Sequence, residues 1–172
     1  MEIGGCCAVL GGSGFVGRHV VDALLSLGQF STVRIVDLRA SAHAGAADMR
    51  FADLSDPEQL AAAVRGCAAV IHSAGIVDTR SGALHDARIQ HANVAGTKAV
   101  IEACRRERVE VLVFVSSHSA ASDGAWGDDA GALHGEGRAS AYGRSKRAAE
   151  RAIIAAHDSA GLATAAVRPQ VV

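Results

Sequence analysis

The sequence predicts an α/β fold in which one doubly wound parallel sheet carries helices on both faces, giving three layers. Short apolar runs alternate along the chain with longer, Ala-rich amphipathic segments, which is the pattern of successive strand and helix units. Hydrophobic residues make up 49% of the sequence, well above the share found in a disordered chain. A length of 172 residues suits one domain, so we expect residues 1–172 to form a single folded unit.

The elements follow from these runs in chain order. The expected strands are residues 6–10, 33–37, 49–51, 69–72, 109–115 and 164–168, with 49–51 the weakest. The expected helices are residues 14–27, 57–64, 86–106 and 141–160. The helix at 57 has a clear start, because Ser55 or Asp56 can cap its free amides and Pro57 occupies a position that needs no donor.

Two stretches interrupt the alternation. Residues 43–48 form a small polar loop, and residues 118–140 are rich in Gly, Asp and Ser. The longer stretch is either a flexible connector or a mobile loop over a site. The chain stops directly after the sixth expected strand. We therefore expect an excised or incomplete domain, or a minimal nucleotide-binding unit without its substrate half.

Composition excludes several partners. The 17 Lys and Arg against 18 Asp and Glu give a net charge of −1, and aromatic residues are 3% of the chain. A nucleic acid or an anionic membrane needs clustered cations, and base stacking needs aromatic platforms. No apolar run reaches the length of a transmembrane helix, and the first residues do not resemble a signal peptide. We expect a soluble, cytoplasmic protein whose partner is a small molecule.

Cysteine and histidine do not point to a metal. The four cysteines lie in apolar runs without the spacing of a zinc site, and the eight histidines form no cluster with ligand spacing. We expect no metal, and reduced, buried thiols at Cys6, Cys7, Cys67 and Cys104.

A glycine-rich loop joins the first expected strand to the first expected helix. Gly11, Gly14 and Gly17 fall three residues apart, with Phe15 and Val16 opening the helix. Such a loop needs residues without Cβ for its tight turn, for close approach of a pyrophosphate and for packing of the helix on the strand. The helix N-terminus offers free amides to phosphate oxygens. This position predicts a dinucleotide site.

Two acidic residues extend this prediction. Asp37 ends the second expected strand, twenty residues beyond Gly17, where a carboxylate can accept hydrogen bonds from an adenosine ribose. Such an acid repels a 2′-phosphate, which favours NAD, whereas the nearby Arg39 leaves NADP open. Asp53 is either a contact to the adenine edge or an ordinary turn acid.

Tyr142 is the only tyrosine of the chain, and Lys146 follows it by four residues. On a helix this spacing places both side chains on one face. A nearby ammonium favours the phenolate, so we expect Lys146 to lower the Tyr142 pKa from its usual value of about 10. The phenol could then exchange a proton with a substrate alcohol or carbonyl. Ser116 and Ser117, at the end of the expected strand 109–115, either steady the substrate oxygen or merely close the strand.

Several motifs together resemble the extended short-chain dehydrogenase/reductase family, over essentially the whole chain. They are the Gly11 to Gly17 loop, Asp37, Ala52-Asp53-Leu54, Val70-Ile71-His72-Ser73-Ala74-Gly75, Asn93-Val94-Ala95-Gly96-Thr97, Val115-Ser116-Ser117, Tyr142-Gly143-Arg144-Ser145-Lys146 and Arg168-Pro169. The resemblance implies a Rossmann-type fold with NAD as cofactor.

The resemblance also implies roles for individual residues. Ser117, Tyr142 and Lys146 would be catalytic, with Ser119 a rival for the serine role. Ser116, Tyr142, Lys146 and Pro169 would lie near the nicotinamide. The rest of the dinucleotide would be lined by Gly11, Gly14, Phe15, Val16, Gly17, Asp37, Asp53, Leu54, Ala74 and Asn93.

Within the family, the segments after Ile76 and around Asn93 most resemble the 3-beta-hydroxysteroid dehydrogenase/isomerase group. This resemblance implies an NAD-dependent oxidoreductase of a secondary alcohol or ketone, as in steroid biosynthesis. UDP-sugar epimerases or dehydratases and dihydroflavonol-type reductases share the framework. The resemblance implies a C-terminal substrate domain that we expect these 172 residues to lack, so a non-catalytic NAD-binding module is a further alternative. Relatives pair the helices bearing Asn93 and Tyr142 into a homodimer.

Overall fold

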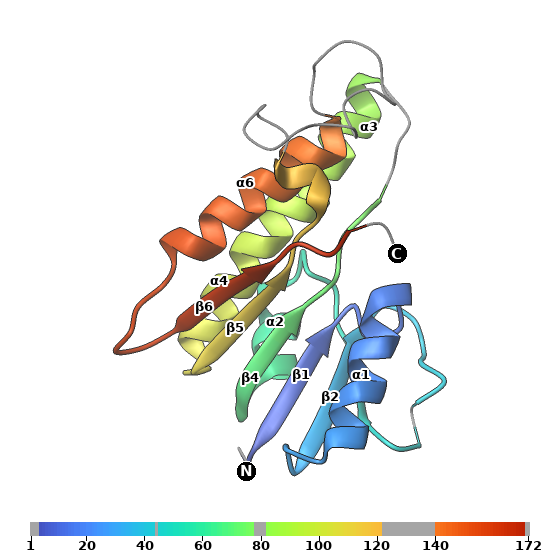
Figure 1. Cartoon of the computed structure of the whole chain (residues 1–172), viewed down its shortest axis with the longest axis vertical. Coiled ribbons are helices and arrows are strands. Elements are labelled where there is room, and N and C mark those ends of the chain that lie inside the picture. Colours follow the sequence, from blue (N-terminus) through green and yellow to red (C-terminus); the bar gives the residue numbers. More distant parts are fainter. Residues whose placement is uncertain (1–3, 44, 78–81, 122–139, 171–172) are drawn as a thin grey trace.

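The computed structural model describes residues 4–43, 45–77, 82–121 and 140–170. Six parallel strands form one sheet in the order β3-β2-β1-β4-β5-β6 (Figure 1). The strands are β1 (Cys6–Leu10), β2 (Thr32–Asp37), β3 (Asp48–Phe51), β4 (Cys67–His72), β5 (Val111–Val115) and β6 (Ala163–Val167). The order reverses direction between β1 and β4, and open α/β sheets bind ligands outside the carboxyl ends of the strands at such a point.

Helices lie on both faces of the sheet. On one face α1 (Phe15–Leu27) packs over β1 and β2, and on the other lie α2 (Pro57–Val64), α4 (Gly96–Arg106) and α6 (Ala141–Ala155) (Figure 1). A shorter helix, α3 (Ala83–Gln90), a π-helical segment, η1 (His91–Ala95), and a 3-10 turn, η2 (His118–Ala121), complete the described elements. The predicted three-layer Rossmann-type fold is confirmed.

The alternation of strand side chains builds two apolar cores. The larger core joins Leu10 and Leu112 of the sheet to Leu60, Val100 and Ile153 of the helices on one face. The smaller one joins Val9 and Ile35 to Val21 of α1. Successive strand residues point to opposite faces, so a sheet covered on both sides needs continuous apolar strands.

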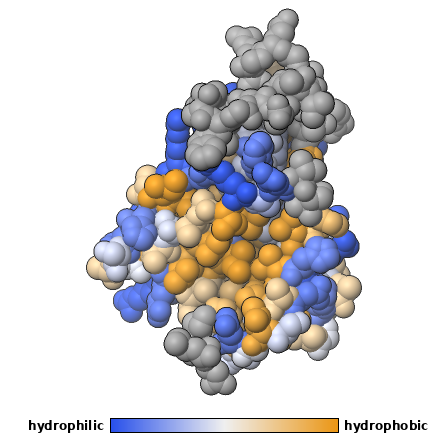
Figure 2. All heavy atoms as spheres, in the orientation of Figure 1, coloured by the Kyte–Doolittle hydropathy of each residue, from blue (hydrophilic) through white to orange (hydrophobic). Residues whose placement is uncertain are grey.

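The face that carries α1 is covered only in part. Beyond α1, apolar side chains reach the surface over the remaining strands (Figure 2), where Val111 of β5 is 39% exposed and Val167 of β6 is 48% exposed. Within the described ranges, no helix packs over these strands on that face.

The predicted helix 86–106 is wrong in its start and its regularity. It begins one turn earlier, at Ala83 of α3, and a five-residue π-helical segment, η1 (His91–Ala95), separates α3 from α4. A π segment inserts an extra residue into the turn and is not visible in apolar periodicity. The predicted helix 141–160 also ends early, at Ala155, because Asp158 caps a tight turn by accepting from the amide of Ala160.

Strand boundaries differ by one or two residues. β5 begins at Val111 rather than 109 because Arg108 adopts a left-handed conformation with φ of 57° in the turn after α4. β4 begins two residues earlier than predicted, at Cys67, and β6 is displaced by one residue. The long predicted loop 118–140 begins with the η2 turn, and residues 122–139 lie outside the described residues, so its role as a mobile loop stays a prediction.

Candidate active site

The glycine loop leaves no room for side chains at two of its positions. Gly11 has φ of +78°, and a Cβ there would lie 2.6 Å from the backbone of Ala74. At Gly17 in α1, a Cβ would lie 2.1 Å from the carbonyl oxygen of Gly11. Such distances are shorter than atoms tolerate, so glycine is required at both positions. The loop therefore packs closely against the segment that follows β4 and against the first turn of α1.

The N-terminus of α1 is open toward ligands. Its N-cap residue is Gly14, which provides no side-chain hydrogen bond, so the first amides of the 13-residue helix have no side-chain acceptor there. The Phe15 side chain lies on the surface of α1, where the Arg18 guanidinium carbon is 4.8 Å from its ring centroid. Phe15 and Val16 are the first two residues of α1, so their backbone amides are among those without a side-chain acceptor.

Asp37 is fixed in place at the carboxyl end of β2. Its carboxylate accepts hydrogen bonds from the amides of Ser13, at 3.0 Å, and Arg39, at 3.1 Å. The hydroxyl of Ser13 donates in turn to the Arg39 carbonyl at 2.9 Å. The acid is thus tied to the glycine loop on one side and to the chain after β2 on the other.

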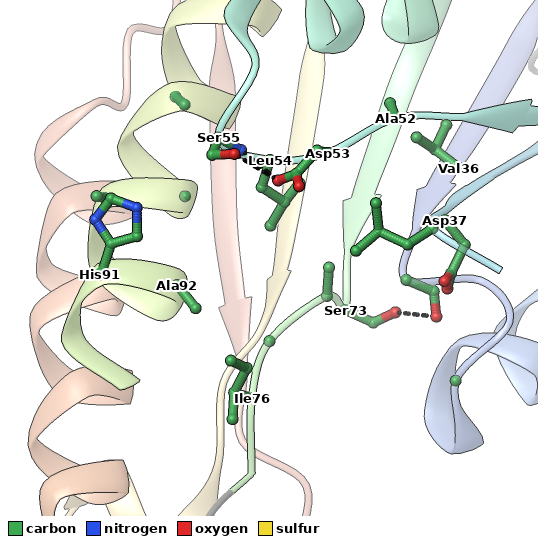
Figure 3. A pocket seen from close by; sticks show the side chains of 18 of the residues that line it. Val36, Asp37, Ala52, Asp53, Leu54, Ser55, Ser73, Ile76, His91 and Ala92 are labelled. Atoms are coloured by element: carbon green, nitrogen blue, oxygen red, sulfur yellow. Dashed lines mark hydrogen bonds between the residues drawn. The ribbon is translucent and has the colours of Figure 1, made fainter. Parts of the chain in front are cut away.

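A cavity of about 760 Å³ opens beside this acid, between the carboxyl ends of the strands and the helix that contains η1 (Figure 3). A cavity of this size is ample for a nucleotide-sized ligand. Of the sequence-predicted residues, six line it: Gly11, Gly14, Asp37, Asp53, Leu54 and Ala74. Phe15, Val16, Gly17, Asn93, Ser116, Ser117, Tyr142, Lys146 and Pro169 are not part of its lining.

Sequence reasoning missed the wall contributed by the helix. Arg88, His91 and Ala92 line the cavity from α3 and η1, and Figure 3 shows His91 and Ala92 across from Asp53 and Leu54. Their positions depend on the π segment, for which the sequence carries no signal. Gly96 is the exception, because a Cβ there would lie 3.2 Å from Leu54, and a glycine inside a helix suggests such a close approach.

Asp53 is a turn acid, one of its two predicted interpretations, and the adenine contact stays a prediction. Its carboxylate accepts from the amide and the hydroxyl of Ser55, each at 2.8 Å, as a turn acid does. These bonds, led by the one from the amide, lower the Asp53 pKa. The residue also lines the cavity opposite Ile76 (Figure 3).

Asn93 joins the chain after β4 to α6. Its amide oxygen accepts from the Ile76 amide at 2.7 Å, and its amide nitrogen donates to the Ile76 carbonyl at 3.0 Å and to the Ser145 hydroxyl at 2.9 Å. The Ser145 hydroxyl in turn donates to the carbonyl of Tyr142. Asn93 is 4% exposed, so its place in this structure is that of a buried connector rather than a cavity wall.

The predicted serine, tyrosine and lysine meet at the carboxyl end of β5. The Lys146 ammonium donates to the Val115 carbonyl at 2.6 Å, directly before Ser116 and Ser117. The Ser117 side chain forms a hydrogen bond with the Tyr142 phenol. Backbone bonds from Ser116 to Val167 and from His118 to Pro169 bring the end of β6 alongside. Ser119 hydrogen-bonds the Ser117 hydroxyl through its amide, at 3.2 Å.

The expected lowering of the Tyr142 pKa by Lys146 is wrong in this structure. Burial raises the pKa of Tyr142 above 10, opposed only by its hydrogen bond to Ser117. Burial also lowers the pKa of Lys146 to about 8, opposed by the negative charge of Glu150. The ammonium donates to the Val115 carbonyl and lies 4.1 Å from the ring centroid of Phe114. Both of these partners belong to β5.

Glu150 continues this line of side chains along α6. It lies one turn beyond Lys146 and forms two hydrogen bonds with the Arg168 Nε, at 3.0 and 3.2 Å. The hydrogen bonds from Arg168 lower the Glu150 pKa most, and burial opposes them by raising it. A hydrogen bond with Ser116 lowers it further, so the pKa is lowered overall. This ion pair joins α6 to Arg168, which follows β6 and directly precedes Pro169.

All four cysteines are free and buried, as predicted. Across the described ranges there is no group of three or more potential metal ligands. Nor does any helix in that part of the chain have the length and apolarity needed to cross a membrane.

The donor set fits a dinucleotide. A glycine loop without room for Cβ atoms, an uncapped helix N-terminus and a fixed acid border a large apolar cavity, and a serine, a tyrosine and a lysine meet at the same edge of the sheet. These features define a Rossmann-type domain of the extended short-chain dehydrogenase/reductase class.

Comparison with known families places the chain within this class. The model of the 3-beta hydroxysteroid dehydrogenase/isomerase family matches residues 8–172, and the chain belongs to that family.

Individual relatives agree with this placement. The 3 beta-hydroxysteroid dehydrogenase/Delta 5-->4-isomerase of vaccinia virus (strain Ankara) is 28% identical, over 94% of this chain and 51% of the relative. The sterol-4-alpha-carboxylate 3-dehydrogenase, decarboxylating, of Bos taurus is 30% identical, over 95% of this chain and 45% of the relative. The chain thus spans about half the length of the curated relatives it matches.

Solved structures share the fold. MoeE5 in complex with UDP-glucose and NAD is 30% identical to this chain, with a TM-score of 0.76, covering 95% of this chain and 54% of the other.

Proposed function

We propose that the chain is the coenzyme-binding half of an NAD-dependent oxidoreductase that acts on a secondary alcohol or ketone of the 3-beta-hydroxysteroid type. The observation that carries the proposal is that the glycine-loop cavity and the cluster of Ser117, Tyr142 and Lys146 lie at the same carboxyl edge of the sheet, at the ends of strands that neighbour one another. Membership of the 3-beta hydroxysteroid dehydrogenase/isomerase family supports the substrate class.

The cavity and the glycine loop would hold the adenosine and pyrophosphate portions of NAD. Asp37, whose orientation is set by two amides, would accept hydrogen bonds from the ribose hydroxyls. The first amides of α1 would meet the pyrophosphate, and Asp53, Leu54 and Ala74 would border the adenosine. Bound NAD would supply the hydride acceptor.

The cluster at the end of β5 would handle the proton. The Tyr142 hydroxyl would take or give the proton at the substrate oxygen, and the Ser117 hydroxyl, already hydrogen-bonded to the phenol, would steady that oxygen. The raised pKa of Tyr142 keeps the phenol protonated in the free chain. Ser116 and Pro169 would border the nicotinamide, with Lys146 holding its ribose.

The test separates binding from chemistry. On the full-length protein that includes the substrate-binding half, Tyr142→Phe is expected to abolish turnover of a 3-beta-hydroxysteroid while NAD affinity, measured by calorimetry, changes little. Tyr142 is the only tyrosine of the chain, so Ser26→Ala, on the exposed surface of α1, serves as the control and should retain turnover. Equal loss of affinity and turnover in Tyr142→Phe would assign the tyrosine a structural role.

Two alternatives are separated by a substrate screen. The likeness to MoeE5, whose structure contains UDP-glucose and NAD, favours sugar nucleotides as the second substrate class to try. Dihydroflavonol-type alcohols complete the screen. NAD binding without turnover of any class by the full-length protein would instead support a non-catalytic NAD-binding module.

Homodimerisation through the helices that carry Asn93 and Tyr142 is part of the proposal. Between α4 and α6 lies a shallow groove, bordered by Ile101 and Ala152 and rimmed by Lys98, Glu102 and Arg105. Small residues permit close helix packing. A light-scattering mass equal to one chain at micromolar concentration would refute the dimer. The cytoplasmic location stays a prediction.

A further inference from the structure

Two buried cysteines face each other at the amino edge of the sheet, far along the strands from the cavity. Cys6 begins β1 and Cys67 begins β4, and the two residues are direct partners in the parallel ladder. Their sulfur atoms lie 2.8 Å apart, so one thiol donates a hydrogen bond to the other. The residues are 7% and 3% exposed, respectively.

An irregularity in the sheet brings the two thiols together. The register between β1 and β4 shifts directly after Cys6, so that Cys6 pairs with Cys67 but Cys7 pairs with Ala69. Strict alternation from Val70 would place Cys67 on the opposite face. The extra residue, Ala68, reverses this and turns Cys67 into the same core as Cys6.

A cation lies against the pair. The Arg34 guanidinium on β2 donates to the Cys67 sulfur at 3.3 Å and to the Asp48 carboxylate at 2.7 Å. The same side chain donates to the carbonyls of Ala63 and Arg65, each at 2.9 Å. Three other acceptors thus hold one guanidinium beside the Cys67 sulfur, and its positive charge also helps to lower the pKa of Cys6, whereas the hydrogen bond to Cys6 and burial raise the pKa of Cys67.

We propose that Cys6 and Cys67 form an oxidative modification site, at which a hydroperoxide converts the two thiols into a disulfide between β1 and β4. Neighbouring strand positions lie within the distance that a disulfide spans. The hydrogen bond from Cys67, aided by the charge of Arg34, lowers the pKa of Cys6 to about 7 despite burial. Burial instead raises the pKa of Cys7 and of Cys104 to about 12.

The chemistry balances with the hydroperoxide as oxidant. The Cys6 thiolate attacks one peroxide oxygen and the O–O bond breaks, giving a sulfenic acid and a hydroxide or alkoxide that takes up the proton Cys6 has lost. The Cys67 sulfur then attacks the sulfenic sulfur. The S–S bond forms, the S–O bond breaks, and the departing hydroxide leaves as water with the Cys67 proton. Two thiols are oxidised and one peroxide is reduced.

The experiment maps the crosslink in the folded chain. Reduced protein is treated with hydrogen peroxide, its remaining thiols are alkylated under denaturing conditions, and nonreduced peptides are identified by mass spectrometry. The expected main product links the peptide containing Cys6 and Cys7 to the peptide containing Cys67. Cys7→Ser and Cys104→Ser are matched controls, because both of these thiols are also buried, and both variants should form the crosslink as the parent does.

The variants Cys6→Ser and Cys67→Ser should lack the crosslink. Circular dichroism checks that they fold, and Cys6→Ala and Cys67→Ala replace either serine variant that does not. Crosslinking that survives in Cys6→Ser, joins two chains, or runs through Cys7 or Cys104 would overturn the proposal. So would oxidation of single thiols to sulfinic acid, or an absence of oxidation, while the protein is folded.

Discussion

The Lys146 ammonium donates a 2.6 Å hydrogen bond to the Val115 carbonyl, so the only buried lysine of the described chain is attached to the strand whose end carries Ser116 and Ser117. Burial lowers its pKa to about 8. This means that the ammonium form dominates below about pH 8 and is lost above it.

The first prediction concerns the pH dependence of coenzyme binding. If the Lys146 ammonium holds the nicotinamide ribose, NAD affinity should fall as pH rises through about 8, by up to about tenfold per pH unit. Lys146→Met should bind NAD more weakly and lose this pH dependence. Lys98→Met is the matched control, since Lys98 is exposed on α4, and should keep it. Calorimetry between pH 7 and 9.5 makes the measurement, and a profile unaltered by Lys146→Met would contradict the assignment.

The second prediction concerns Glu150 and stability. The Arg168 guanidinium leads the causes that lower the Glu150 pKa, so the ion pair stabilises the fold above the ordinary carboxyl pKa, and this contribution is lost as pH falls from that value through the lowered pKa of the folded state. Glu150→Gln should reduce the free energy of unfolding at pH 7 by about 1–2 kcal/mol, between the values for exposed and fully buried pairs.

Urea denaturation at pH 7 and pH 3 tests this second prediction. The difference between Glu150→Gln and the parent should shrink at the lower pH. Glu102→Gln is the control, because Glu102 pairs with Arg105 in an exposed i,i+3 bridge, and it should have little effect. A Glu150→Gln penalty that is the same at both pH values would show that packing, not charge, is lost.

The third prediction concerns the glycine loop. Gly17→Ala places a methyl group 2.1 Å from the Gly11 carbonyl oxygen, and relief of this overlap must move α1 away from the loop. We expect a loss of about 1–3 kcal/mol in the free energy of unfolding, together with weakened NAD binding. Gly45→Ala, where an added Cβ meets no atom within 4 Å, should be nearly neutral. Unchanged stability in Gly17→Ala would refute the steric argument.

The fourth prediction concerns coenzyme choice. Asp37→Ala removes the acceptor for the ribose and the negative charge that repels a 2′-phosphate, so NAD affinity should fall and the preference over NADP should narrow by about tenfold or more. Asp37→Asn removes the negative charge but keeps one oxygen that can accept from the amide of Ser13 or Arg39. Comparison of the two variants therefore separates the effect of the charge from the effect of a disturbed loop. A preference that stays unchanged in both variants would place the ribose elsewhere.

Much of the fold could be predicted from sequence because the local patterns agree with one another. The apolar strands, the cap at Asp56 and the position of the glycine loop all favour one parallel sheet. Residues whose roles depend on backbone geometry, such as Gly11 and Gly17, were identified for the same reason. Boundaries were less certain, because a left-handed Arg108 and the π segment at Asn93 leave no trace in hydrophobic periodicity.

The sequence by itself determined the order of the elements, the glycine loop and the placement of Tyr142 and Lys146 on one helix, since all of these depend on residues that are near one another in the chain. Only the tertiary structure decided which partners the charged and titratable side chains have and in which direction their pKa values move. It directs the Lys146 ammonium at Val115, buries Tyr142 so that its pKa rises, and brings Cys6 to Cys67 through a shift in register. Burial and electrostatic environment are set by segments distant in sequence, and spacing along one helix carries no information about them.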